Sequence, residues 1–455
     1  MISPLVISLC SCDKKQEEPI KARITYDLLD GEKSCEYFDY SFNLDDYANI
    51  SDSPNNDILK MSMLFDANIS DNSRVEFDHT KYPAENNLDQ ESFYNHLGLE
   101  GFEKVTIVSP TEYDLNDITF LNFGHKVVDL NGTKYDICFI TSKDSGLGKS
   151  WISNFDVGHD DDSYYIQTGE HPEWTNKENH KGFDVAANRC LEVIDDYKTR
   201  VLDQNSQQIF YIFGHSRGGA IANVLAAKLV DLGYQTVSYA LASPAVTTSN
   251  NAHDEKYNHL YSYTCYEDPV TKALSFDLNF KRYGKTISFS IKDYLKEFKQ
   301  YNGFGFPTGD ASPIISLLKN LSDGRGDIYL CSIKYMVAKV ETMDEALEYL
   351  TPFTGAYEYL KNFVLISLTL INNTSYYVVE VCPGFFTSLF GLLISRAGLN
   401  LSTITEELSP LKTYNYLNCL ISVSGVKLND LLSLNPDYLI CTHFYPSYLT
   451  YINSL

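Results

Sequence analysis

One short segment constrains the fold of this chain more than any other: an apolar run that enters a G-x-S-x-G sequence and leaves it as a helix-forming run. The run Gln208–Phe213 reads Gln-Ile-Phe-Tyr-Ile-Phe, and the motif after it reads Gly214-His-Ser-Arg-Gly218. A serine on a sharp turn between a strand and a helix stands clear of the backbone, and the helix N-terminus faces any negative charge that develops there. We therefore predict that Ser216 is a nucleophile and that Gly214 and Gly218 leave room for the neighbouring backbone.

Strand-like and helix-like segments alternate on both sides of this motif. Strands rich in Ile, Phe, Tyr and Val, separated by amphipathic helices, are typical of a parallel sheet covered on both faces. The dipeptide Asn131-Gly132 suits a tight hairpin turn. The sequence predicts an α/β fold with helices over 58–65, 90–99, 183–201 and 217–232, strands over 208–213, 236–241 and 260–266, and a hairpin over 117–141.

The charge and hydropathy of the chain argue against some functions. Among 455 residues, 60 are acidic and 36 are basic, so the formal net charge is −24. A chain of this charge repels phosphate backbones unless it carries a local basic stripe, and we find none. The richest apolar runs, 363–371 and 385–394, are too short to span a bilayer. We expect a globular protein that neither binds nucleic acid nor crosses a membrane.

The cysteines and acidic residues do not predict a metal site. The ten cysteines have no paired short spacing of the kind that binds zinc. Cys138 and Cys265 lie in apolar stretches, where a free cysteine packs as a small hydrophobic residue; a disulfide framework is the alternative. Asp160–Asp162 are interpreted as a solvated acidic turn, and Lys143 stands where a phosphate-binding loop over 142–150 needs glycine. We expect no metal and no cofactor.

The N-terminal segment has a composition of its own. A short apolar run ends in Cys10-Ser-Cys12, and a polar stretch follows it. This resembles the end of a bacterial lipoprotein signal, which implies acylation of Cys12 and a tether to an outer membrane face. The protein would then be extracellular or attached to the cell surface. The alternative is that residues 1–22 are simply a tail and linker.

A nucleophilic serine needs a base and an orienting acid. In α/β-hydrolases these follow the serine in the order acid, then histidine. The loop after the strand over 260–266 carries Asp268, with Glu267 as the alternative acid. The histidines after Ser216 are His253, His259 and His443, and only the last of these follows Asp268. We predict a catalytic triad of Ser216, Asp268 and His443.

Several segments resemble the class 3 (fungal-type) lipases. The likeness covers about 115–275 and the C-terminal segment, and it implies an α/β-hydrolase fold and cleavage of carboxylic esters, typically acylglycerols. The residues that carry it are Gly214–Gly219, Ala242-Ser-Pro244, Glu267–Val270, Trp151-Ile-Ser-Asn154, His180–Phe183 and His443–Leu449. By this likeness His180 is a structural histidine, and His215 is a side chain packed beside the nucleophile elbow, the turn Gly214–Gly218 that carries Ser216.

The oxyanion segment departs from the family. Such lipases usually carry Phe-Arg-Gly-Thr or Phe-Arg-Gly-Ser, and the corresponding residues here are Phe139-Ile-Thr-Ser142. By position, the NH group of Ser142, together with its hydroxyl as a further candidate, would bind the oxyanion, with the NH of Arg217 as the second donor; Thr141 is the neighbouring candidate. Loss of one such donor costs on the order of 3 kcal/mol in the barrier.

The long stretch between Asp268 and His443 predicts an insertion. We expect residues 23–455 to form one lipase-like domain with a largely helical cap over about 275–430. The cap would line an acyl pocket or face a lipid surface, or its stretches would simply pack on the sheet. The expected helices are Ile333–Leu350, Tyr357–Leu370 and Phe385–Ile394.

The function that follows is a serine ester hydrolase of lipase type that acts on a lipid or another ester. Two alternatives stay open. A catalytically silent binding protein on the same fold would lack a formed oxyanion hole, and the missing Arg-Gly pair favours it. A serine amidase or peptidase would use the same triad. The sequence leaves the acyl-chain length and the oligomeric state open.

Overall fold

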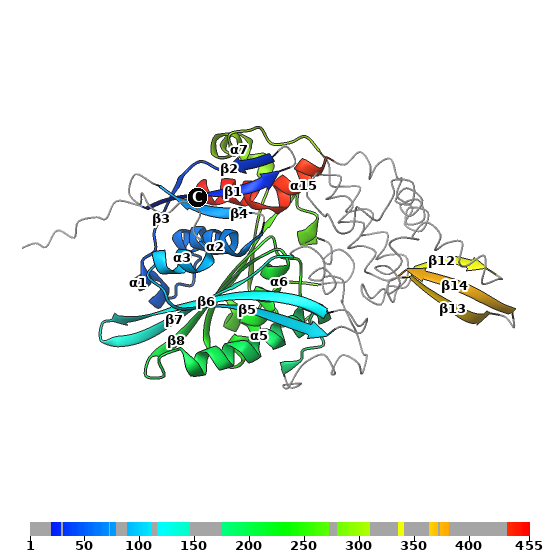
Figure 1. Ribbon diagram of the computed structural model, residues 1–455, viewed down its shortest axis with the longest axis horizontal. Helices are drawn as coiled ribbons and strands as arrows, with labels where there is room; N and C mark the ends of the chain where they lie inside the picture. The colour runs from blue at the N-terminus through cyan, green and yellow to red at the C-terminus, as the bar shows by residue number, and fades with distance from the viewer. Residues whose placement is uncertain are drawn as a thin grey trace, which may run out of the picture.

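The computed structural model of the chain describes residues 20–28, 31–71, 73–78, 89–110, 116–145, 174–272, 280–309, 335–340, 364–371, 374–381 and 435–455. Its centre is a seven-stranded sheet with the order β11-β10-β9-β8-β7-β6-β5 (Figure 1). The neighbours from β7 to β11 are parallel, and β5 and β6 add an antiparallel edge. The strands are β5 (Glu100–Pro110), β6 (Asn116–Leu130), β7 (Thr133–Ser142), β8 (Gln207–His215), β9 (Gln235–Leu241), β10 (Leu260–Cys265) and β11 (Lys285–Phe289).

The predicted elements around the motif are confirmed. The hairpin joins β6 to β7 through Asn131 and Gly132, both of which have positive φ angles, as that turn requires. Strands β8 to β10 and the four predicted helices lie within a few residues of the expected positions. These helices are α2 (Asn56–Ile69), α3 (Gln90–His96), α5 (Lys181–Arg200) and α6 (Arg217–Asp231). The chain has the α/β-hydrolase fold, with a mostly parallel central sheet.

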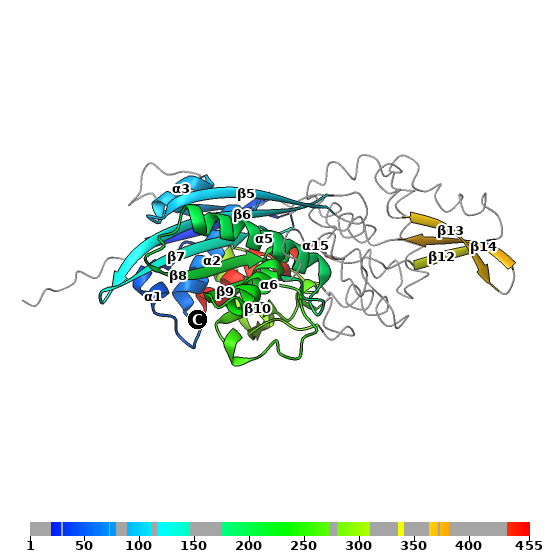
Figure 2. The same cartoon turned by 90° about the horizontal axis from the view of Figure 1, so that it is seen from below.

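Helices cover both faces of the central sheet (Figure 2). On one face, α5 and α6 pack their apolar sides against alternating residues of the strands, such as Cys138, Ile140 and Phe210. On the other face, α2 and α16 (Tyr445–Asn453) pack against the intervening residues, such as Phe139 and Phe213. Because each strand is buried on both faces, β7 to β10 read as almost continuous apolar runs.

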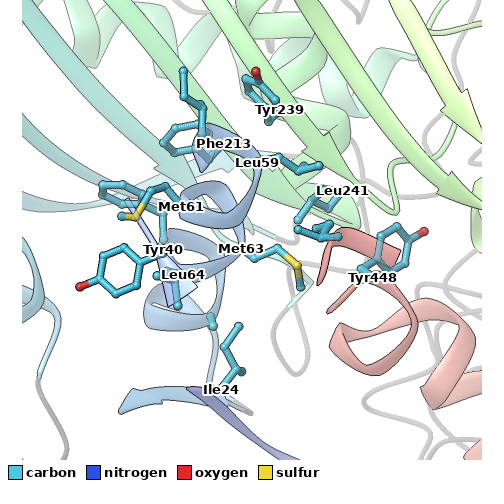
Figure 3. Packing of buried hydrophobic residues seen from close by; sticks show 14 of the residues in the cluster. Ile24, Tyr40, Leu59, Met61, Met63, Leu64, Phe213, Tyr239, Leu241 and Tyr448 are labelled. Atoms are coloured by element: carbon cyan, nitrogen blue, oxygen red, sulfur yellow. The ribbon is translucent and has the colours of Figure 1, made fainter. Parts of the chain in front are cut away.

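A small antiparallel sheet lies beyond α2 and buries the outer side of this helix. Figure 3 shows Met63 and Leu64 of α2 between this sheet, represented by Ile24, and the central sheet, represented by Phe213 and Leu241. Sequence analysis did not identify this sheet. Its strands are β1 (Ile20–Leu28), β2 (Gly31–Ser34), β3 (Phe38–Tyr40) and β4 (Ser73–Phe77), and α1 (Leu44–Ala48) follows β3.

The described part of the region expected to form a largely helical cap contains strands. Strand β11 extends the central sheet, and η5 (Ile291–Tyr294) leads into α7 (Leu295–Asn302) beside α16. Two of the three stretches expected to be helical overlap with β12 (Tyr335–Val340) and β13 (Val364–Ile371), which pair with β14 (Thr374–Val381). These helix predictions were wrong because an apolar run rich in β-branched residues also fits a strand. The stretch 385–394 lies outside the described residues.

Other predictions can be compared only in part. The five cysteines that the structure describes are all buried, as expected of small core residues: Cys35, Cys138, Cys190, Cys265 and Cys441. Cys12, Trp151–Asn154 and Asp160–Asp162 lie outside the described residues. Within the described part of the chain, no helix is both long and apolar enough to cross a bilayer.

Candidate active site

Ser216 stands on a strained turn between β8 and α6. Its backbone has φ 55° and ψ −124°, a conformation that non-glycine residues rarely adopt. Two backbone hydrogen bonds hold it there: the NH of Ser216 donates to the carbonyl of Leu241 at 2.8 Å, and the NH of Ala220 donates to the carbonyl of Ser216 at 3.0 Å. The surrounding sheet and helix therefore keep the hydroxyl at the end of β8.

The two glycines of the motif are required by close backbone contacts. A Cβ atom on Gly214 would overlap with the carbonyl group of Gly218, and one on Gly218 would overlap with the carbonyl oxygen of Ser142. Any side chain at these positions would push α6 away from β7 and β8. The glycines thus let the helix N-terminus approach the strand ends beside Ser216.

The structure brings the three predicted triad residues together. The Nε2 atom of His443 lies 2.9 Å from the Oγ atom of Ser216. The Nδ1 atom of the same ring lies 2.8 Å from Oδ2 of Asp268. The carboxylate is fully buried, whereas the other two residues each keep 8% of their surface exposed. A hydroxyl, an imidazole and a carboxylate in this chain can activate the hydroxyl as a nucleophile.

Asp268, and not Glu267, faces the imidazole. The carboxylate of Asp268 also accepts the NH of Val270 at 2.9 Å and the hydroxyl of Tyr448 at 3.3 Å. Glu267 points elsewhere, where it accepts the Ser290 hydroxyl and the Ile291 NH. The other two histidines after the elbow are also occupied, since His253 contacts the carbonyl of Gly284 and His259 that of Ser51.

The C-terminal segment carries His443 at a break between two helices. Helix α15 (Pro436–His443) is capped by the Asn435 side chain, and the extended backbone of Phe444 separates it from α16. Helix α16 is fixed to the body of the protein: Tyr448 accepts the NH of Cys265 at 3.1 Å, and Asn302 of α7 donates to Thr450 at 3.0 Å. These contacts fix the C-terminal segment, and with it His443, to the core of the protein.

The predicted oxyanion residues lie on either side of the elbow. Arg217 is the first residue of α6, and its buried guanidinium donates to Thr119 of β6 at 3.1 Å. Ser142 ends β7 and pairs with Gly214 of β8. Its hydroxyl is buried and has no hydrogen-bond partner among the described residues. Thr141 faces the opposite side of β7, where its hydroxyl lies 3.3 Å from that of Tyr94.

A buried polar group near this site was not identified from the sequence. Asp144 follows the oxyanion segment, and its carboxylate accepts the Ser70 hydroxyl at 3.2 Å. Asp66 of α2 is almost fully buried, and within the described residues neither of its oxygens has a hydrogen-bond partner. Burial, with the charge of Asp144 in addition, raises the pKa of Asp66 well above its usual value. No group of three or more metal-binding side chains occurs within the described ranges.

Residues 140–277 match the family model for lipase (class 3). The resemblance to the class 3 lipases is confirmed. The class 3 lipase match runs from β7 to the loop after β10, so it includes Ser216 and Asp268, while His443 lies beyond it. It supports a lipase-type hydrolase. A search of curated proteins found no match.

Solved lipase structures are similar to part of this chain. A triacylglycerol lipase from Penicillium expansum is 15% identical over 42% of this chain and 69% of its own, with a TM-score of 0.25. A mono- and diacylglycerol lipase from Aspergillus oryzae is 18% identical over 48% and 74%, with a TM-score of 0.28. The Rhizomucor miehei lipase in its native propeptide complex is 17% identical over 53% and 70%, with a TM-score of 0.30. At these TM-scores, the likenesses carry no weight in assigning a substrate.

Proposed function

We propose that this protein is a serine hydrolase that cleaves carboxylic esters of the acylglycerol type through an acyl-enzyme. The observation that carries the proposal is the continuous hydrogen-bonded chain from Ser216 through His443 to the buried carboxylate of Asp268. This arrangement supports acyl transfer because the base contacts the nucleophile and the acid orients the base.

In the proposed reaction, the Ser216 oxygen attacks the ester carbonyl while Nε2 of His443 accepts the hydroxyl proton. The imidazolium that forms is stabilised by the Asp268 carboxylate at Nδ1. Collapse of the tetrahedral intermediate transfers the proton to the leaving alkoxide and leaves an acyl group on the serine. Water, deprotonated by the same imidazole, then releases the carboxylic acid and restores the hydroxyl.

The oxyanion would be stabilised at the N-terminus of α6. The NH group of Arg217 belongs to the first residue of this helix, where the helix dipole favours negative charge. The second donor we propose is Ser142, whose strand end contacts Gly218 directly. The segment that carries this donor differs from the Arg-Gly-Thr pattern of the family. The experiment must therefore also distinguish the two alternatives, a silent binding protein and an amidase.

A panel of p-nitrophenyl esters of increasing acyl length, assayed with the wild-type protein and with Ser216→Ala, tests the proposal. We expect hydrolysis by the wild type and a loss of about 10⁴-fold or more in kcat in the variant. Absence of serine-dependent turnover on every ester, with no labelling by a fluorophosphonate, would favour the binding protein. Labelling of Ser216 without ester turnover would favour the amidase.

A further inference from the structure

The residue before the nucleophile contacts the backbone of the catalytic histidine. His215 is the last residue of β8, pairs with Leu241 of β9, and is 2% exposed. Its Nε2 atom lies 2.8 Å from the carbonyl oxygen of His443. The two residues are 228 positions apart in the sequence. One side chain therefore links the elbow directly to the residue that carries the base.

The protonation state of this ring is defined by its surroundings. Burial, together with the nearby His443 imidazole, lowers the pKa of His215 to about 3. The ring is therefore neutral at working pH and has a single NH group. A carbonyl oxygen only accepts, so this NH is at Nε2 and donates to His443. A neutral donor at this position does not oppose the positive charge that the catalytic imidazole gains during the reaction.

The His443 carbonyl that accepts this bond has no donor within its own helix. Helix α15 ends at His443, and the last carbonyl groups of a helix have no intrahelical donor. The His215 ring also packs against the aromatic residues that follow, with centroid distances of 5.5 Å to both Phe444 and Tyr445. The side chain thus satisfies the helix end and supports the chain immediately beyond it.

We propose that His215 is a positioning residue, whose hydrogen bond to the His443 carbonyl sets the place of the imidazole relative to Ser216. His215, the donor, and Ser216, the nucleophile, are neighbours at the end of β8. The hydrogen bond therefore fixes the position of the catalytic histidine relative to the nucleophile. This inference rests on the proposed function, and it goes beyond the triad because it assigns a function to the second residue of the G-x-S-x-G motif.

The test compares His215→Phe, which keeps an aromatic ring but removes the donor, with His215→Gln, which keeps an NH donor at similar reach. We expect the phenylalanine variant to lose about 10- to 100-fold in kcat with little change in KM, because a displaced catalytic group costs that much. The glutamine variant should recover most of the lost activity. His253→Phe is the matched control, since it removes a bond of 2.8 Å to the Gly284 carbonyl away from the site.

A second readout is independent of turnover. The proton between Nδ1 of His443 and Asp268 should give a far-downfield NMR resonance, which we expect to be retained in His215→Gln and shifted or broadened in His215→Phe. If the wild type hydrolyses no ester, the proposed function fails, whereas this resonance still reports the placement of the imidazole.

Three results would overturn the inference. The first is wild-type kcat and an unchanged resonance in His215→Phe, and the second is a glutamine variant as defective as the phenylalanine one. If His215→Phe does not fold, His215→Met replaces it as the variant without a donor. Failure of both to fold while His215→Gln folds is the third result, because the bond would then serve the fold and not the imidazole.

Discussion

The three triad residues and the region around the oxyanion segment differ in how completely their polar groups are paired. On the triad side, the imidazole bonds at both nitrogens and the Asp268 carboxylate has three donors. On the oxyanion side, the Ser142 hydroxyl and both Asp66 oxygens have no partner among the described residues. Buried polar groups without partners are costly, and they occur at functional sites more than elsewhere. The comparison indicates that the triad is assembled in this structure, and that the oxyanion side still has groups available for water or substrate.

The largest effect is expected on the triad side, from Asp268→Asn. The amide cannot stabilise the imidazolium, so kcat should fall by about 10³- to 10⁴-fold while the fold is retained. Ester assays on the purified variant measure this. Glu267→Gln is the matched control, because the neighbouring carboxylate bonds Ser290 and Ile291 and not the imidazole. A larger loss in Glu267→Gln than in Asp268→Asn would contradict the assignment of the acid.

On the oxyanion side, we expect a smaller effect from Ser142→Ala, about 100-fold in kcat, if its hydroxyl donates to the oxyanion. Ser142→Thr should restore part of the rate because it keeps the hydroxyl. Thr141→Val serves as the control, since the Thr141 hydroxyl lies beside that of Tyr94 on the other face of β7. Equal rates in Ser142→Ala and the wild type would leave only the backbone of Ser142 as a donor.

The difference between the two sides also explains what the sequence could predict. The elbow is local: a strand, two glycines and a helix occupy 25 consecutive residues, Gln207–Asp231, so that the pattern alone indicated its geometry. The base was found only through the expected order of the triad and the small number of histidines. The contacts of His215 and Tyr448 that hold the base join segments about 180 or more positions apart. Contacts over such separations leave no periodic pattern in the sequence.

The buried corner at Asp66 and Asp144 was not predicted from the sequence. Asp66 lies within an apolar helical run, and single-sequence reasoning would place its side chain on a solvated face. Helix α2 is instead buried on all sides, between the central sheet and the sheet of β1 to β4 (Figure 3). Strand β1 does alternate, since Ala22, Ile24 and Tyr26 are buried and polar residues stand between them. The sequence analysis did not use this pattern, so the second sheet and the burial of this carboxyl group were missed together.

A moderate effect is expected from Tyr448→Phe. The hydroxyl donates to Asp268 and accepts the NH of Cys265, so its removal should cost about 1 to 2 kcal/mol of unfolding free energy and lower kcat about fivefold. Denaturant titration and ester assays measure the two losses. Tyr451→Phe, on the same helix and stacked on Phe289, is the control. If both variants lose activity equally, the packing of α16, and not this hydroxyl, supports the carboxylate.

The smallest effect is a gain in stability from Asp66→Asn. The pKa of Asp66 is raised in the folded state, so folded protein binds more protons than unfolded protein above the ordinary pKa of an aspartate, and its stability falls as pH rises. The neutral amide removes this dependence of stability on pH.

We expect the Asp66→Asn variant to gain about 1 kcal/mol or more in unfolding free energy at pH 8, and the gain to shrink as pH falls toward 4. Asp57→Asn, in the first turn of the same helix, should instead lose a few tenths of a kcal/mol at pH 8, because a carboxylate there interacts favourably with the helix dipole. A loss of stability in Asp66→Asn at pH 8 would mean that the carboxylate is charged and paired, and the contrast with the triad would then rest on the Ser142 hydroxyl alone.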